Sequence, residues 1–255
     1  LGTTNPWTVA ILDGTNNITN LANAQYANAA TWARAASNGD SIFVITSIAQ
    51  VDMPGMTGGL VMYRSTDAGA TWVGPDEIPL VNSSNFLRVS ADDYALDMNK
   101  NGKIAIVLGN YQVEVLTSTD WGTTFTNQIV VETNDINGVP NSIFDPNGGT
   151  LDTLNTTDGS FSLVVDDNDM VHVWYGRQRM WKDLATTAGA TYLPLTVGLA
   201  YWNDAMTEAT VIHETRIAAE QIELCNPLFS NQVTDNVSGF QASLYSASYT
   251  SMPSA

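Results

Sequence analysis

A short turn motif occurs twice and constrains the fold of this chain more than any other feature. Residues 65–72 and 118–125 both read Ser-Thr-Asp-x-Gly-x-Thr-aromatic, with the two aspartates 53 positions apart. Glycine permits a positive φ where a chain reverses, and short Asp, Ser and Thr side chains can bond the backbone groups that a turn leaves unpaired. Each copy therefore predicts a tight β-hairpin turn, whose last residue starts the next strand with a buried ring. The residues expected to build the two turns are Ser65, Asp67, Gly69, Thr71, Trp72, Ser118, Asp120, Gly122, Thr124 and Phe125.

Short strand-like runs recur in the same order around this motif. Before the first copy come the apolar runs 41–46 and 60–63, and before the second copy come 103–109 and 113–116. A third round has strand-like runs at 161–165, 170–176 and 198–202, and its turn has decayed to 203–207. Repeats of about 40–50 residues with four strands each are typical of β-propeller blades. We therefore expect an all-β protein, a β-propeller with four-stranded antiparallel blades.

The repeats suggest how the chain divides. We expect a single β-propeller domain over residues 1–255, with blade-like units at about 30–80, 90–135 and 160–210 and partial units at 1–29 and 236–255. Three units and two partial ones do not readily close a ring, and an open ring leaves sheet edges unprotected. We expect the chain to be part of a longer polypeptide that forms a six-bladed or larger ring. The alternative is a five-bladed ring with a divergent last blade.

The repeated motif resembles the Asp box, or BNR repeat, of sialidase-like β-propellers. Three stretches, 63–72, 93–97 and 198–203, are also similar to propellers of large secreted proteins, many of which carry a type IX sorting domain. The resemblance covers roughly residues 30–207. It implies that the Asp boxes are structural, and that the protein is secreted or displayed on the cell surface.

The same resemblance would bring an arginine triad, a Tyr–Glu nucleophilic pair, an Asp acid and a Phe/Tyr-Arg-Ile-Pro segment if it extended to sialidase activity. That segment is missing here. We therefore assign no catalytic residue, and expect a binding or structural module that contacts extracellular proteins or glycans. The alternative is a secreted glycan-active hydrolase, a sialidase-like glycosidase, with its active residues on channel-facing loops or in missing blades.

Carboxylates are numerous, so a catalytic pair does not stand out. Glycosidases use two carboxylates at a defined separation. Among the candidates, Asp97 and Asp166 follow first strands, but we expect turn capping rather than catalysis from them. The full set is Asp92, Asp93, Asp97, Glu114, Asp166, Asp167, Glu208 and Glu214.

Arginine and aromatic residues gather in the third unit and are the candidates for ligand contact. Arg177, Arg179 and Trp181 combine charge and ring surface suited to sugars or peptides. Trp174 and Trp202 are expected to fill the core between blades instead.

No cofactor is expected, although Ca²⁺ is possible. The acidic and amide-rich runs 166–169 and 134–138 carry the oxygen ligands that calcium takes, without the spacing of a known calcium loop. The two histidines, His172 and His213, stand apart from paired cysteines, which disfavours a zinc site.

Charge and composition exclude several partners. Nine basic against 26 acidic side chains give a net charge of −17, which argues against nucleic acid because phosphate binding needs clustered Lys and Arg. No run of about 18 apolar residues suggests a membrane span. Cys225 is the single cysteine, so no intrachain disulfide is expected.

Overall fold

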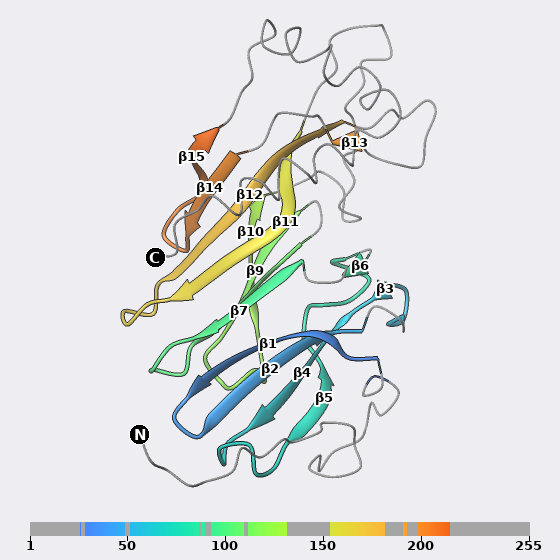
Figure 1. The fold of residues 1–255 in the computed structure, drawn as a ribbon, viewed down its shortest axis with the longest axis vertical. Coiled ribbons are helices and arrows are strands. Elements are labelled where there is room, and N and C mark those ends of the chain that lie inside the picture. The colour runs from blue at the N-terminus through green and yellow to red at the C-terminus, as the bar shows by residue number, and fades with distance from the viewer. Residues whose placement is uncertain are drawn as a thin grey trace, which may run out of the picture.

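The structure of the protein is a computed structural model, and every named element in it is a β-strand. It describes residues 26, 29–48, 52–86, 88–89, 93–109, 112–131, 154–181, 191–192 and 198–214. Most of these residues form three successive antiparallel sheets (Figure 1), each with a path of four strands, to which the third sheet adds one short strand.

Neighbouring strands of each sheet follow one another along the chain, except that the short strands β3 (Thr57–Gly58) and β13 lie off these paths. Sheet 1 has the order β1-β2-β4-β5 and sheet 2 has the order β10-β9-β8-β7. In sheet 3 the order is β11-β12-β14-β15, and β13 pairs with β12. The strands of sheet 1 are β1 (Thr31–Asn38), β2 (Ser41–Ser47), β4 (Leu60–Ser65) and β5 (Val73–Glu77). The strands of sheet 2 are β7 (Tyr94–Met98), β8 (Ile104–Leu108), β9 (Val113–Ser118) and β10 (Thr126–Val131). The strands of sheet 3 are β11 (Leu154–Val165), β12 (Val171–Trp181), β13 (Thr191–Tyr192), β14 (Gly198–Asn203) and β15 (Thr210–Glu214).

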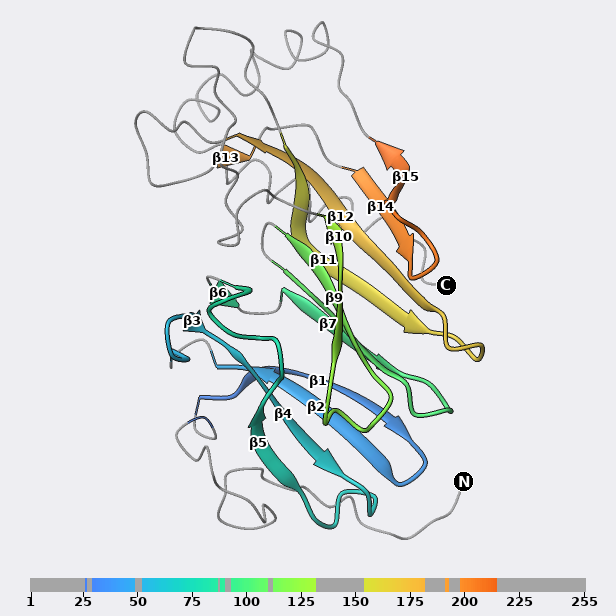
Figure 2. The ribbon, with the colours of Figure 1, turned by 180° about the vertical axis from the view of Figure 1, so that it is seen from behind.

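The three sheets stack face to face, with sheet 2 in the middle (Figures 1 and 2). Strand β8 shows why the middle sheet is apolar on both sides. Its residues Ile104, Ile106 and Leu108 pack in the core shared with sheet 1, whereas Ala105 and Val107 pack in the core shared with sheet 3. A strand buried on both faces reads as a continuous apolar run instead of an alternating one.

The two ends of the stack differ. The tight turns lie at one end, where β1 meets β2 and where β7, β9, β11 and β14 each end in a short reversal. Neighbouring sheets touch through these turns: Asn38 Nδ2 donates to Lys100 O at 2.8 Å, and Asn99 Nδ2 donates to Asp166 O at 2.9 Å. At the opposite end each first strand begins and each last strand ends, so the chain leaves one sheet and enters the next there. Binding and catalytic residues are often found where rigid elements are connected.

The expected all-β, four-stranded antiparallel organisation is confirmed. The number of blades and the closure of a ring stay predictions, and nearly all of 1–29 and all of 236–255 lie outside the described residues. Sheet 3 starts at Leu154, earlier than the predicted 160, because Asp158-Gly159 lies inside a bulged strand. A second unpredicted feature is a short parallel pairing of β3 (Thr57–Gly58) with β6 (Arg88–Val89).

The search for membrane-spanning helices over the described residues finds none long and apolar enough.

Candidate functional site

The two copies of the repeated motif form turns with the same hydrogen bonds. In the first, the Asp67 carboxylate accepts from Thr71 N at 2.8 Å and from Thr71 Oγ1 at 2.6 Å. Ser65 Oγ donates to Asp67 Oδ1 at 2.8 Å and accepts from Gly69 N at 2.9 Å. Because one carboxylate and one hydroxyl satisfy the backbone of the reversal, the turn holds itself in shape.

The second turn repeats this arrangement around Asp120. Its carboxylate accepts from Thr124 N at 2.9 Å and from Thr124 Oγ1 at 2.6 Å, and Ser118 Oγ accepts from Gly122 N at 2.9 Å. The hydrogen bond from the Thr124 side chain, then that from its backbone, lowers the pKa of Asp120 to about 2. The pKa of Asp67 is lowered in the same way, first by the Thr71 side chain. Both carboxylates are therefore ionised acceptors within the turns.

The second turn also attaches sheet 2 to sheet 1. The Trp121 ring meets the Phe43 ring edge to face, with centroids 6.0 Å apart, and Arg64 Nη1 donates to Trp121 O at 3.2 Å. A Cβ placed on Gly122 would lie 2.7 Å from Phe43 Cε2. The glycine thus serves both the turn, with a φ of 74°, and the close approach to the neighbouring sheet.

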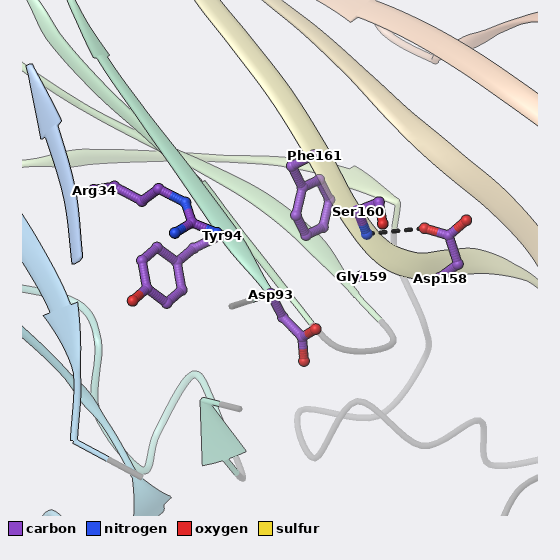
Figure 3. A pocket seen from close by; sticks show the side chains of 7 residues that line it. All are labelled: Arg34, Asp93, Tyr94, Asp158, Gly159, Ser160 and Phe161. Atoms are coloured by element: carbon purple, nitrogen blue, oxygen red, sulfur yellow. Dashed lines mark hydrogen bonds between the residues drawn. The ribbon is translucent and has the colours of Figure 1, made fainter. Parts of the chain in front are cut away.

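A cavity of about 170 Å³ lies at the opposite end of the stack, where the first strands of the three sheets begin. It is lined by residues of β1, of the start of β7 and of β11 (Figure 3). These residues are Arg34, Asp93, Tyr94, Asp158, Gly159, Ser160 and Phe161. The cavity is smaller than the roughly 300–1,000 Å³ of typical ligand pockets, so it suits one small polar unit.

Arg34 and Tyr94 form one wall of the cavity. The Arg34 guanidinium carbon lies 5.7 Å from the centroid of the Tyr94 ring, within the range of a cation–π contact. The Tyr94 hydroxyl donates to Trp32 O at 2.6 Å and accepts from Ser47 N at 2.9 Å. These bonds to sheet 1 fix the ring, so its face toward Arg34 is held in place.

A bulge in β11 forms the opposite wall. Thr157 pairs with Arg177 and Phe161 pairs with Tyr175, so residues 158–160 together stand opposite one residue of β12. Gly159 has a φ of 87°, and Ser160 N donates to Asp158 Oδ1 at 2.8 Å. Bulges bend a strand and redirect its side chains, and they are frequent beside active sites.

Two carboxylates lie on either side of Gly159. The Asp93 carboxylate rests against Gly159, and the Asp158 carboxylate rests against Gly176 of β12, so that a Cβ at either glycine would collide with the acid. Figure 3 shows the Asp158 carboxylate directed away from Arg34 and Asp93. A larger residue at either position would therefore have to displace the neighbouring carboxylate.

Of the candidate carboxylates from the sequence, Asp93 lines this cavity, whereas Asp97 and Asp166 lie away from it. Asp97 Oδ2 accepts from Val165 N at 2.7 Å and so links sheet 2 to sheet 3. Asp166 Oδ1 accepts from Asn168 N and Met170 N, both at 2.8 Å. The Met170 backbone contributes most to the lowered pKa of Asp166. Asp166 therefore caps its own turn, as expected from the sequence, whereas Asp97 does not cap a turn but bonds the backbone of the neighbouring sheet.

The predicted ligand-contact residues follow one strand. Arg177, Arg179 and Trp181 belong to β12, but only the Arg177 side chain is among those described. Arg177 is buried on the face that packs against sheet 2. Burial raises the pKa of Tyr175 to about 12, and the charge of Arg177 opposes this shift. Arg177 is thus placed between sheets, and the contact of the three residues with a ligand stays a prediction.

The expectation that two tryptophans fill the core between blades is met by Trp202, which is fully buried between sheets 2 and 3. Trp174 is half-buried and lies on the opposite face of sheet 3, where it stacks on His172 and is tilted against Tyr201. For Trp174 the expectation stays a prediction. Successive residues of a strand point to opposite faces of the sheet. Val173 and Tyr175 face sheet 2, so Trp174 between them faces the other way.

Sequence reasoning missed the cavity because its walls come from three distant segments. Of the lining residues, the sequence indicated only Asp93, as one of several candidate carboxylates. One signal was present in the sequence: the pair Asp158-Gly159 stands just before the strand-like run that starts at Phe161. A lone glycine in a strand pattern indicates a bulge or a close approach of another group.

Among the described residues no group of three or more His, Cys, Asp or Glu side chains is placed to hold a metal ion. The run 134–138 lies outside them, and calcium binding stays a prediction.

No protein-family model and no curated protein matches this chain. Among solved structures, it is similar to a mutant of the α-L-arabinofuranosidase arb93a from Fusarium graminearum, solved with an iminosugar inhibitor. That match has a TM-score of 0.43 and 16% identity, and covers 75% of this chain and 50% of that one. The chain thus spans about half the length of that enzyme. A second match is the α-L-arabinofuranosidase CtGH43 from Clostridium thermocellum, with a TM-score of 0.32, 12% identity, and 71% and 72% of the two chains covered. These values are too low to assign an activity.

Proposed function

We propose that this protein acts on glycans, as a glycoside hydrolase whose sugar enters the cavity between β1, β7 and β11. The observation that carries the proposal is the pair of carboxylates, Asp93 and Asp158, on neighbouring first strands at the rim of one cavity. Glycoside hydrolysis needs two carboxylates, one to protonate the leaving oxygen and one to act as base or nucleophile.

The other walls of the cavity suit a sugar. The rings of Tyr94 and Phe161 offer apolar surface to the faces of a sugar ring, and Arg34 and Ser160 offer polar groups to its hydroxyls. In this proposal Asp93 is the first carboxylate of the catalytic pair. Asp158, on the other side of Gly159, is the second (Figure 3).

The proposal includes the architecture expected from the repeats. In it, the three sheets are successive blades of a β-propeller, and β1, β7 and β11 are the strands nearest the axis. Three features support this: equal strand order in each sheet, face-to-face stacking, and contacts between first strands of adjacent sheets. Export to the cell surface or the medium is part of the same proposal, and rests on the resemblance to secreted propellers.

The test is a panel of fluorogenic glycosides with the full-length protein and the variants Asp93→Asn and Asp158→Asn. The control is Asp167→Asn, at the tight-turn end, where Asp167 makes an exposed ion pair with Lys100. Losing an acid–base group costs about 10²–10⁴-fold in rate, so we expect turnover to fall by at least 100-fold in the first two variants and to be unchanged in the control. Turnover that persists in Asp93→Asn would contradict the assignment.

The second candidate is the binding module without catalysis, and the direction of the Asp158 carboxylate, away from Asp93, favours it (Figure 3). It predicts no turnover of any glycoside, together with calorimetric binding of an oligosaccharide that Asp93→Asn weakens and Asp167→Asn does not.

A further inference from the structure

The outer face of sheet 3, on the side away from sheet 2, carries a connected group of rings. His172 Nδ1 lies 2.7 Å from the Tyr201 hydroxyl, and the Trp174 and Tyr201 ring centroids are 5.3 Å apart. Beside them, Val164 is 43% exposed. We call this group, consisting of Val164, His172, Trp174 and Tyr201, the outer aromatic face. None of its members belongs to either core cluster of the described residues.

In sheets 2 and 3, the same pattern of residues in the first strand packs on the face of the preceding sheet. The first strand of sheet 2 begins with Tyr94, and alternate residues from it, Leu96 and Met98, face sheet 1. The Tyr94 hydroxyl even bonds the backbone of sheet 1.

The first strand of sheet 3 shows the same pattern in its C-terminal half. Phe161, Leu163 and Val165 are alternate residues of β11, and all three pack in the core shared with sheet 2. In both cases an aromatic residue is followed at two and four positions by apolar residues, and this row covers the preceding sheet.

The sequence contains the same row once more, after sheet 3. Phe240, Ala242 and Leu244 have the same spacing, and they lie outside the described residues. Strand β15 reaches Glu214 at the end of the stack where first strands begin, because Glu214 pairs with Gly198. Residues 215–238 would then form a connection about as long as 132–153, which joins sheets 2 and 3.

We infer that residues 239–245 form the first strand of a fourth sheet, and that Phe240, Ala242 and Leu244 dock on the outer aromatic face. The occupant is a segment of this chain, because a tethered segment meets the face at a high effective concentration, whereas a second copy or another protein must be recruited from solution. Docking would remove the apolar surface of Val164 and Trp174 from water.

The test is hydroxyl-radical footprinting of the full chain read by mass spectrometry. Trp174 is compared with Trp32, which is 50% exposed and serves as an internal reference of the same residue type. We expect Trp174 to be oxidised several-fold more slowly in the wild type than in the variant Phe240→Asp/Leu244→Asp, with the rate at Trp32 the same in both. The matched control is Gln241→Asp/Ser243→Asp, which changes the other side of the same segment and should leave Trp174 protected.

A second measurement needs no substitution. Hydrogen exchange on the wild-type chain should show slowed amides at 240–244, as expected for a paired strand. Three results would overturn the inference: Trp174 oxidised equally fast in the wild type and in Phe240→Asp/Leu244→Asp, unprotected amides at 240–244, or protection of Trp174 that disappears on dilution. The last result would identify a second copy as the occupant.

Discussion

The Asp93 carboxylate lies against Gly159, in space that the Cβ of any other residue at this position would enter. This contact joins the start of β7 to the bulge of β11, and so connects two sheets at the rim of the cavity. A substitution at Gly159 can therefore move the Asp93 carboxylate while Asp93 itself is left unchanged.

We predict that Gly159→Ala moves the Asp93 carboxylate and weakens whatever the cavity binds or converts. The matched control is Gly102→Ala, because Gly102 has a similar φ of 84° against 87° and no atom within 4 Å of its missing Cβ. Left-handed backbone costs a non-glycine residue about 1–2 kcal/mol, so both variants should lose that much stability by chemical denaturation. Only Gly159→Ala should also lose ligand affinity or turnover, and equal function in both would contradict the role of the contact.

The second prediction concerns acid stability and the Asp120 turn. The folded pKa of Asp120, about 2, lies below the ordinary value of 3.8, so its ionised form stabilises the fold. That contribution is present above pH 3.8 and is lost as the pH falls through about 2. Asp120→Asn should therefore unfold at lower denaturant concentration than the wild type at pH 7, and the gap should narrow toward pH 2. A gap independent of pH would show that the charge is not what the turn needs.

A third prediction separates the two turns. Gly122→Ala places a Cβ 2.7 Å from the Phe43 ring, whereas Gly69→Ala meets its nearest neighbours at 3.5 Å or more. Both glycines have positive φ, 74° and 86°, so the backbone cost is shared. Overpacking a core typically costs a further 1–3 kcal/mol, and we expect about that difference between the two variants in free energy of unfolding. Equal losses would mean that the Phe43 side of the interface yields.

The fourth prediction rests on Glu114, a buried acid of β9. Its carboxylate accepts from Gln112 Nε2 and from Asn127 Nδ2, both at 2.6 Å, yet burial outweighs these bonds and raises its pKa above the ordinary 4.5. A raised folded pKa means that stability is fully present below pH 4.5 and is lost as the pH rises through the folded value. Glu114→Gln has no charge to bury. The stability of this variant relative to the wild type should increase from pH 4 to pH 7, and a constant difference would contradict the shift.

The sequence did not show that the residues lining the cavity form one site, because they lie far apart along the chain. Arg34, Asp93 and Asp158 come from three sheets, and no spacing along the chain relates them. The bulge that brings Gly159 under Asp93 depends on the pairing of β11 with β12, which local patterns do not encode. The face of sheet 3 that carries Trp174 was also not evident from the sequence, since the face that a strand residue takes is set by the register with its partner strands.

The sequence alone determined the local structures, because the hydrogen bonds of each Ser-Thr-Asp turn run between residues at most four positions apart, and strand alternation is visible within one run. It therefore indicated the all-β class, the four-stranded repeat and the two turns. Tertiary structure decided which faces the sheets share and which side chains border the cavity. Those contacts join segments tens of residues apart, and their geometry follows from how whole sheets stack, not from any single stretch of chain.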